Sequence, residues 1–197
     1  AVIEGGKFDG VYYGLPYRTS SSIMYYNKTM FDEAGVPYPE AGWTYDDMLE
    51  IAKKLTIPGE QYGVGIGASN ADPSNVFLTL SPVIWSYGGD YLNEDQTECT
   101  LNTPEAIEAI RYWTGLYTTE KVAPEGAVNY TMTKDIMPLF IENKVALMMG
   151  GDQNAVEFDT NYPDLNYGYC VPPKAPSGSG GWLFTVPVTA KNSPGAY

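Results

Sequence analysis

The chain has 197 residues, enough for one domain, with 24 acidic against 11 basic side chains and no histidine. Its net charge of −13 argues against a nucleic acid or an anionic membrane as the partner. The lack of histidine excludes Ser-His-Asp and Cys-His catalysis and the usual zinc sites. No apolar run approaches the roughly 20 residues that a membrane-spanning helix needs. What is left is a binding domain, or an enzyme that works with carboxylates.

The aromatic residues are mostly of the kind that carries a polar group. Seventeen tyrosines and four tryptophans stand against six phenylalanines. Such rings suit a site in which a flat ligand face is stacked and its edge is hydrogen-bonded. The same rings could instead fill a strand-rich core. Composition alone does not separate these two interpretations.

The two cysteines, Cys99 and Cys170, stand far apart and match no C-x-x-C metal or redox motif. In an oxidising compartment they could form a disulfide bond. Two buried free thiols are an equally good interpretation, because unpaired cysteine behaves as a small apolar residue. Both alternatives stay open.

The first hundred residues alternate between short strands and helices. Strands of β-branched and aromatic residues are expected at 11–13 and 23–26, separated by Gly14-Leu15-Pro16 and a Thr/Ser cluster. The segment after the second strand contains two helix starts. The elements expected there, in chain order, are a helix from the Asn27 cap to Gly35, a helix from the capping box of Thr44 and Asp47, a strand at 62–66, a helix from Pro73 that carries Phe77, Leu80 and Ile84, and a hairpin between 91–92 and 99–101.

The second half continues this alternation. Thr103-Pro104-Glu105 is the clearest helix start in the chain. The elements expected after it are a helix containing Phe140 and Ile141, a strand at 145–149 that Gly150-Gly151 ends, a helix at 152–158, a strand at 167–171, a loop at 172–181 and a strand at 182–188. Alternating strands and helices predict an α/β fold with a mixed, mostly parallel sheet and helices on both of its faces.

Two glycine-rich segments place candidate binding residues. A strand that ends in Gly150-Gly151 and passes into a helix leaves free N–H groups and puts Asp152 and Gln153 at the carboxyl edge of a sheet. Alternatively, Asp152 merely caps that helix. The run 178–181 sets Trp182 directly after a flexible loop. An exposed Trp182 would be a ligand platform, and a buried one would be part of the core.

A glycoside-active enzyme is the main alternative to a binding protein. The 24 acids could include a general acid and a nucleophile about 5–10 Å apart. No pair of acids stands out by its sequence context, however. This alternative therefore has no residues to carry it.

Several segments resemble one family in their order and spacing, over nearly the whole chain. They are Gly14-Leu15-Pro16, the runs 24–28, 31–36, 43–48 and 52–56, the run 140–148, and Gly180-Gly181-Trp182. Together they resemble the extracellular solute-binding proteins of ABC sugar importers, relatives of maltose-binding protein. The resemblance implies the periplasmic-binding-protein type II fold, in which two α/β lobes joined by crossing strands bind sugar in the cleft between them.

The resemblance also implies a division of the chain. Residues 20–181 would form the second, ligand-binding lobe. Residues 1–19 would be a hinge strand with a remnant of the first lobe, and residues 182–197 a crossing strand back toward that lobe. The chain stops three residues after Ser193-Pro194, which has the pattern of a helix start. We therefore expect a piece of a longer protein.

Candidate ligand contacts carry over from the family position by position. The contacts that follow the proline of the first crossing strand fall on Tyr17, Arg18 and Ser20. The aromatic or polar contact that follows the strand expected at 145–149 falls on Asp152 and Gln153. Relatives commonly have tryptophan where Gln153 stands, so the stacking ring must come from elsewhere, and the candidates for it are Trp85 and Trp182.

The function that the resemblance implies is that of a receptor without catalytic residues, metal or cofactor. It would bind a mono- or oligosaccharide and deliver it to the membrane permease subunits of an ABC transporter. It would be a monomer, either a lipoprotein anchored at the cell surface or a periplasmic protein. A receptor for a peptide or a polyamine on the same scaffold is a further alternative. Neutral sugars need no basic patch, so the net charge of −13 is no obstacle.

Overall fold

The computed structural model describes residues 3–173, 179–187 and 189–191. The chain divides into two compact units, Ala1–Ser21 with Ser179–Tyr197 (unit 1) and Ser22–Gly178 (unit 2). The long strand β3 (Leu15–Asn27) runs from the first unit into the second. The helix start expected at Ser193 lies outside the described residues. So does Val188, the last residue of the strand expected at 182–188.

Unit 2 is built on a sheet with the strand order β4-β5-β3-β6. Its other strands are β4 (Tyr62–Gly65), β5 (Val145–Gly151) and β6 (Tyr167–Cys170). Strands β4 and β5 are parallel, whereas β3 is antiparallel to both β5 and β6. The α/β fold with a mixed sheet is thus confirmed. The expected predominance of parallel pairs is wrong, because β3 runs against both of its neighbours.

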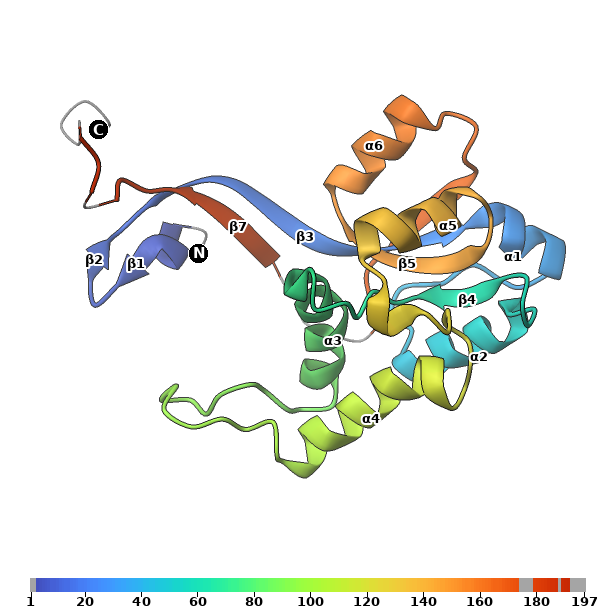
Figure 1. Ribbon diagram of the computed structural model, residues 1–197, viewed down its shortest axis with the longest axis horizontal. Coiled ribbons are helices and arrows are strands. Elements are labelled where there is room, and N and C mark those ends of the chain that lie inside the picture. The colour runs from blue at the N-terminus through green and yellow to red at the C-terminus, as the bar shows by residue number, and fades with distance from the viewer. Residues whose placement is uncertain (1–2, 174–178, 188, 192–197) are drawn as a thin grey trace. The chain divides into compact units, whose positions relative to one another are not determined.

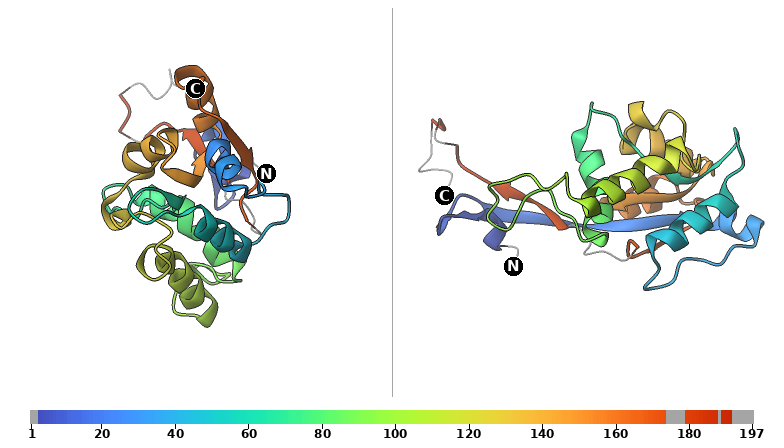
Figure 2. Two further views of the ribbon diagram at one scale, coloured as in Figure 1. Left: turned by 90° about the vertical axis from the view of Figure 1, so that its right-hand side faces the viewer. Right: turned by 90° about the horizontal axis from the view of Figure 1, so that it is seen from below.

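Helices cover both faces of this sheet, as predicted (Figures 1 and 2). One hydrophobic cluster joins the sheet to residues of four helices, and a second cluster lies on the opposite face. The first face carries α1 (Lys28–Ala34), α2 (Tyr45–Leu55), α3 (Pro73–Ser86) and α4 (Pro104–Thr118). The second carries α5 (Met137–Ile141), α6 (Gln153–Asn161) and the π-helix Met132–Ile136. Single 3-10 turns occupy Ile3–Gly6 and Ala127–Asn129.

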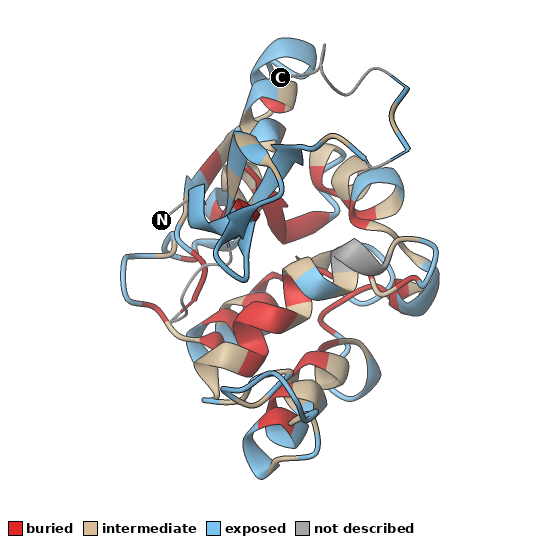
Figure 3. Ribbon diagram, turned by 90° about the vertical axis from the view of Figure 1, so that its left-hand side faces the viewer, coloured by how far each residue is buried: buried red, intermediate tan, exposed pale blue. Residues whose placement is uncertain are grey.

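Strand β5 is buried along its whole length (Figure 3). Val145 and Met148 face the cluster of α5 and α6, while Ala146 and Met149 face the other cluster. A strand with apolar side chains on both faces needs cover on both sides, which the two helical layers supply. The carboxyl end of β5 is therefore held in the middle of the domain.

The helix ends follow the local signals in the sequence. The Asn27 side chain accepts a hydrogen bond from Met30 N, and Gly35 ends α1 with φ 63°. Both bonds of the capping box at Thr44 and Asp47 are present. These predicted caps are confirmed because capping depends on residues within one turn of each other.

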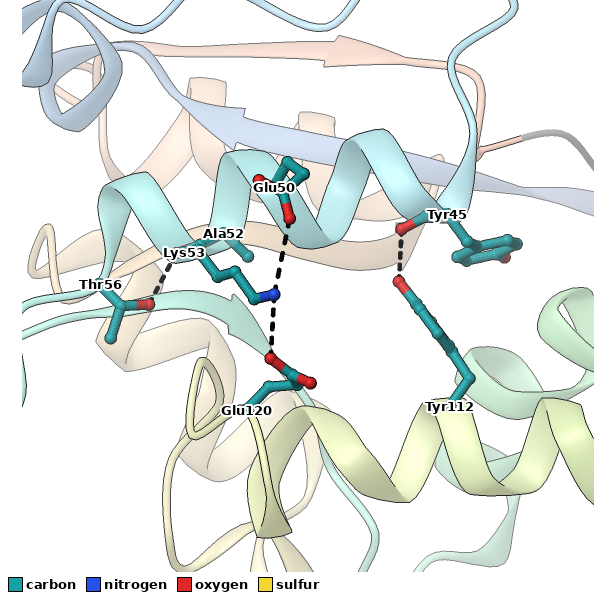
Figure 4. A network of polar contacts seen from close by, with 7 residues as sticks. All are labelled: Tyr45, Glu50, Ala52, Lys53, Thr56, Tyr112 and Glu120. Atoms are coloured by element: carbon teal, nitrogen blue, oxygen red, sulfur yellow. Dashed lines mark hydrogen bonds and ion pairs between the residues drawn. The ribbon is translucent and has the colours of Figure 1, made fainter.

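Polar contacts fasten α2 to α4 above the apolar layer (Figure 4). The Tyr112 hydroxyl donates to the backbone oxygen of Tyr45 at 2.5 Å. Lys53 lies 3.0 Å from a Glu120 carboxylate oxygen and 3.5 Å from one of Glu50. The tyrosine bond is half-buried and directional, so it fixes the two helices more firmly than the exposed ion pairs.

Three strand predictions differ from the structure. The segment expected to separate two strands is mostly strand itself, because Leu15, Pro16 and the Thr/Ser cluster belong to β3 and residues of this segment pair with β7. Gly150 and Gly151 do not end β5 but pair with Ile23 and Ser22 of β3. The expected hairpin is reduced to a single bridge between Leu92 and Cys99.

Unit 1 is a pair of two-stranded ribbons. Strands β1 (Lys7–Phe8) and β2 (Val11–Tyr12) form an antiparallel hairpin. The first half of β3 pairs antiparallel with β7 (Ser179–Phe184). Strand β7 begins three residues before the predicted start at 182.

Gly63 tests the contact between α2 and the sheet. A Cβ added at Gly63 would lie 2.1 Å from the Ala52 carbonyl oxygen, which belongs to the backbone of α2. We expect Gly63→Ala to lower the free energy of unfolding by about 1–3 kcal/mol, because the helix must move away from β4. Denaturant titration with a circular-dichroism readout measures this change.

The matched control is Gly115→Ala in α4. A Cβ there would meet only Thr119 Oγ1, at 3.4 Å. Alanine is favoured over glycine in a helix by roughly 1 kcal/mol, so this variant should be as stable as the wild type or more so. Equal destabilisation by both substitutions would contradict the packing described here.

Candidate functional site

The carboxyl end of β5 forms the first part of the candidate site. Asp152 and Gln153 follow the strand directly, and both side chains are exposed. Each residue of the preceding pair, Gly150 and Gly151, is buried. The strand therefore delivers two polar side chains from a fixed backbone to the edge of the sheet, where α/β folds bind their ligands.

The start of α6 is not capped by Asp152. This residue already has helical angles, with φ −56° and ψ −28°, and its side chain makes no capping hydrogen bond. Instead, the Gly151 N–H group donates to Asn154 Oδ1 at 3.0 Å. The alternative that the Asp152 side chain merely caps the helix is therefore wrong.

Close packing explains why glycines precede the polar pair. A Cβ at Gly151 would lie 2.3 Å from Gln153 Oε1, so the glutamine side chain lies back over the Gly151 backbone. A Cβ at Gly150 would lie 2.5 Å from Asn154 Oδ1 and 3.1 Å from the Tyr25 ring. Both positions require glycine because neighbouring side chains occupy that space.

Trp85 belongs to an aromatic group on α3 and the loop after it. Its indole Nε1 donates to Asp90 Oδ1 at 3.2 Å, and its ring lies edge-on to Phe77, with 6.1 Å between the ring centroids. Phe77 also lies 6.0 Å from Tyr91, whose hydroxyl is bonded to Ser81 Oγ at 2.8 Å. Trp85 is half-buried, whereas Phe77 is 55 % exposed.

Phe77 lies on α3, as predicted, but the sequence reasoning did not single it out as a site residue. The helix was expected to carry Phe77 together with Leu80 and Ile84, and Ile84 is indeed fully buried. Phe77 stands four and eight residues before Ser81 and Trp85, but it stands equally at helical spacing from Leu80 and Ile84, so spacing alone does not predict its exposure. The exposure follows from how α3 packs in the fold. Phe77 is thus an exposed ring beside the half-buried Trp85.

Unit 1 holds the other predicted contacts, on β3 and β7. Arg18 is paired with Trp182, and its guanidinium carbon lies 5.1 Å from the centroid of the tryptophan ring. The Tyr17 ring lies 4.4 Å from that of Phe184. Tyr17 and Arg18 are exposed, Ser20 is half-buried, and Trp182 is 46 % exposed. Trp182 is therefore not a buried core residue.

A register shift in β3 produces the contact between Arg18 and Trp182. Pro16 pairs with Leu183 and Arg18 with Trp182, so Tyr17 is the extra residue. Residues that pair across two antiparallel strands point to the same face. The bulge therefore moves Arg18 onto the tryptophan face, where the cation can lie against the ring.

Burial raises the pKa of several tyrosines in unit 2. Desolvation raises the pKa of Tyr25 to about 12, and desolvation with a hydrogen bond to Asp159 raises that of Tyr167 to about 12. Desolvation also raises the pKa values of Tyr45 and Tyr112 at the contact of α2 with α4. These hydroxyls are neutral at any ordinary pH, and those of Tyr25, Tyr112 and Tyr167 donate hydrogen bonds.

The cysteines are not bonded to each other. Cys99 is exposed, and Cys170 is half-buried at the end of β6. Burial raises the pKa of the Cys170 thiol to about 11, so it is protonated and unreactive near neutral pH. Within the described residues, no group of three or more acids and cysteines is placed to hold a metal ion.

Comparison with known proteins identifies the family. The model of the family described as bacterial extracellular solute-binding protein matches residues 1–197. The chain belongs to this family. Its members are receptors that bind solutes, not enzymes.

Individual relatives agree with this assignment. A binding protein of Brucella abortus is 33 % identical over 174 residues, which are 88 % of this chain and 40 % of that protein. The arabinooligosaccharide-binding protein of Halalkalibacterium halodurans is 29 % identical over 157 residues, 80 % of this chain and 34 % of that protein. A solute-binding protein of an ABC transporter from Thermotoga lettingae, solved with α-D-tagatose, has a TM-score of 0.86 at 26 % identity, covering 98 % of this chain and 50 % of that one.

The chain thus spans between a third and a half of the length of these relatives. The fold match covers nearly all of the chain, so the likeness is not confined to a few motifs. Among the described residues, no helix has the length and the apolar character that crossing a membrane requires.

Alkaline pH tests the buried hydroxyls. The unfolded chain releases the Tyr25 proton near pH 10, whereas the folded chain holds it to about pH 12. The stability that this group contributes is therefore complete below pH 10 and is lost as the pH rises through 12. We expect the free energy of unfolding to fall by about 2 kcal/mol between pH 10 and pH 12 from Tyr25 alone. Urea titrations at both pH values measure it.

The matched control is Tyr25→Phe, which cannot ionise at this position. Its unfolding free energy should fall less over the same interval than that of the wild type. If the variant and the wild type lose equal stability between pH 10 and pH 12, Tyr25 does not carry the raised pKa.

Proposed function

We propose that the chain is part of a carbohydrate receptor of an ABC importer. The receptor binds a sugar or an oligosaccharide outside the cell membrane and delivers it to the permease subunits. Family membership and the sugar ligands named for the relatives support this function. The observation that carries it in this chain is the exposed Trp182 ring with the Arg18 guanidinium against it.

The chemistry of these groups suits a neutral sugar. The C–H face of a pyranose or furanose ring stacks on an indole, and its hydroxyls are held by fork-shaped cationic donors and by carboxylates. Trp182 offers the ring, and Arg18 offers the donors. Asp152 offers hydrogen-bond acceptors, and Gln153 offers both a donor and an acceptor. No step in this function needs a catalytic group. The net charge of −13 also disfavours an anionic ligand.

We propose candidate ligand contacts for each unit taken separately. In unit 1 they are Tyr17, Arg18, Ser20 and Trp182, and in unit 2 they are Trp85, Asp152 and Gln153. Phe77 joins this set because its exposed ring lies against Trp85. Tyr25 and Asn154 stand behind Asp152 and Gln153 without being contacts themselves.

The assignment of the chain to one lobe follows from the fraction of its relatives' length that it matches. We assign residues 20–181 to the second lobe of a two-lobed receptor, with 1–19 and 182–197 as strands toward the first lobe. The full-length receptor is this chain together with the remaining half that its relatives carry. Its cleft would then close around the ligand and exclude water, which strengthens each polar contact.

Trp182→Ala in the full-length receptor tests this function. Wild-type protein should bind at least one member of a panel of pentoses, hexoses and their oligosaccharides, and return it unhydrolysed. The variant should bind that sugar at least fivefold more weakly, corresponding to ~1 kcal/mol for one aromatic contact. Isothermal titration calorimetry measures the affinity, and chromatography of the recovered sugar shows whether it is intact.

Tyr162→Ala is the control. This ring is also partly exposed, but it lies at the far end of α6 from Asp152. Its loss should leave the affinity unchanged. Hydrolysis of the sugar would exclude a receptor. A fall of ~3–5 kcal/mol in the unfolding free energy of Trp182→Ala with unchanged affinity would make Trp182 a core residue.

A further inference from the structure

Tyr25 lies on β3, is fully buried and makes two hydrogen bonds through its hydroxyl. The hydroxyl donates to the Gly151 carbonyl oxygen at 2.8 Å. It also accepts from the Ala155 N–H group at 3.1 Å. One atom of β3 thus holds the backbone directly before Asp152 and directly after Asn154. The ligand-binding turn 151–155 is tied down at both ends.

This hydroxyl takes the place of a capping side chain. In α6 the residue Ala155 is the third helical position, whose N–H group normally bonds to the side chain of the N-cap residue. Asp152 occupies that N-cap position but makes no such bond with its side chain. The Ala155 N–H group instead donates to the Tyr25 hydroxyl, and in a longer bond of 3.3 Å to the Asp152 carbonyl oxygen. The Tyr25 hydroxyl, and not the Asp152 carboxylate, is therefore the capping acceptor.

The position of the hydroxyl is fixed by packing of the ring. The Tyr25 ring lies edge-on to Phe158, with centroids 5.4 Å apart, and 6.0 Å from the Tyr167 ring. Phe158 in turn stacks on Phe140 at 5.5 Å. In a close-packed interior such a ring cannot shift without moving its neighbours. The turn is therefore held against a rigid reference point rather than a mobile side chain.

We propose that Tyr25 is the positioning residue of the ligand-binding turn, and that its hydroxyl sets the orientation of Asp152 and Gln153 toward the sugar. This inference rests on the proposed function. Tyr25 does not touch the ligand, because it is fully buried. Its contribution to affinity passes through the two exposed side chains.

Tyr167 provides a matched control in the same aromatic group. Its hydroxyl donates to Asp159 Oδ1 at 2.8 Å and lies 3.5 Å from the Ala155 carbonyl oxygen. Tyr25→Phe and Tyr167→Phe each remove one hydroxyl that holds α6 to the sheet. Only the Tyr25 hydroxyl bonds to Gly151 and to the Ala155 N–H group, whereas the Tyr167 hydroxyl reaches Ala155 only through its carbonyl oxygen, in a long bond. A general loosening of α6 would affect both variants alike.

The experiment compares these variants in the full-length receptor by calorimetric titration with the sugar that the wild type binds. We expect Tyr25→Phe to weaken binding about fivefold, the scale of one net hydrogen bond. Tyr167→Phe should stay within about twofold of the wild type, with a similar shift in the denaturation midpoint. Equal affinities of Tyr25→Phe and wild type, or equal losses in both variants, would overturn the proposal.

A double-mutant cycle shows whether Tyr25 acts through the polar pair. In a receptor that carries Asp152→Ala and Gln153→Ala, adding Tyr25→Phe should weaken binding by less than about twofold, because nothing is left to orient. The full fivefold effect in that background would overturn the proposal. If Tyr25→Phe does not fold, Asn154→Ala tests the same turn by removing the acceptor of the Gly151 N–H group. Unchanged affinity in that variant would also count against it.

The proposed function and the role of Tyr25 can fail separately. A wild-type receptor that binds no sugar of the panel overturns the proposed function. A wild-type receptor that binds sugar, with variants that show no difference between Tyr25 and Tyr167, overturns only the positioning role. Amide hydrogen exchange gives the structural readout, since residues 151–155 should exchange faster in Tyr25→Phe than in Tyr167→Phe.

Discussion

The pairing of β5 with β3 is the constraint on which the rest of unit 2 depends. Strand β5 is buried along its whole length, so both of its faces must be covered and both of its edges must be paired. Parallel β4 and antiparallel β3 supply the edges, and the two helical layers supply the cover. The strand can end only where the layers end. That point is Gly151, and the exposed polar pair follows it.

The same pairing makes the edge rigid enough to bind a ligand. Gly150 and Gly151 stay in register with Ile23 and Ser22, and the neighbouring Tyr25 ties the turn to the aromatic group beneath α6. A preorganised backbone spares the entropy that a flexible loop would lose on binding. A receptor needs this property more than it needs chemical reactivity. The lack of histidine and the neutral tyrosine hydroxyls of unit 2 agree with that requirement.

How much the sequence could predict depended on the distance over which each signal acts. The caps at Asn27 and Thr44 were predicted correctly, since each involves residues within one helical turn. Only the end of β3, at 23–26, was predicted as a strand, because its Thr/Ser segment is a strand only by virtue of partners more than a hundred residues away. The exposure of Phe77, the bulge that sets Arg18 against Trp182 and the capping of α6 by Tyr25 are likewise products of tertiary packing. The list of candidate contacts came from the family resemblance rather than from any local pattern.

The mass of the ligand that the full-length receptor carries after purification without added solute tests the account most directly. Native mass spectrometry measures the bound mass, and denaturation followed by chromatography identifies the released molecule. The account predicts an added mass equal to that of a pentose, a hexose or a short chain of either. Adding an excess of the same sugar should not change this bound mass. A bound peptide, polyamine or phosphate ester, recovered in stoichiometric amount, would contradict it.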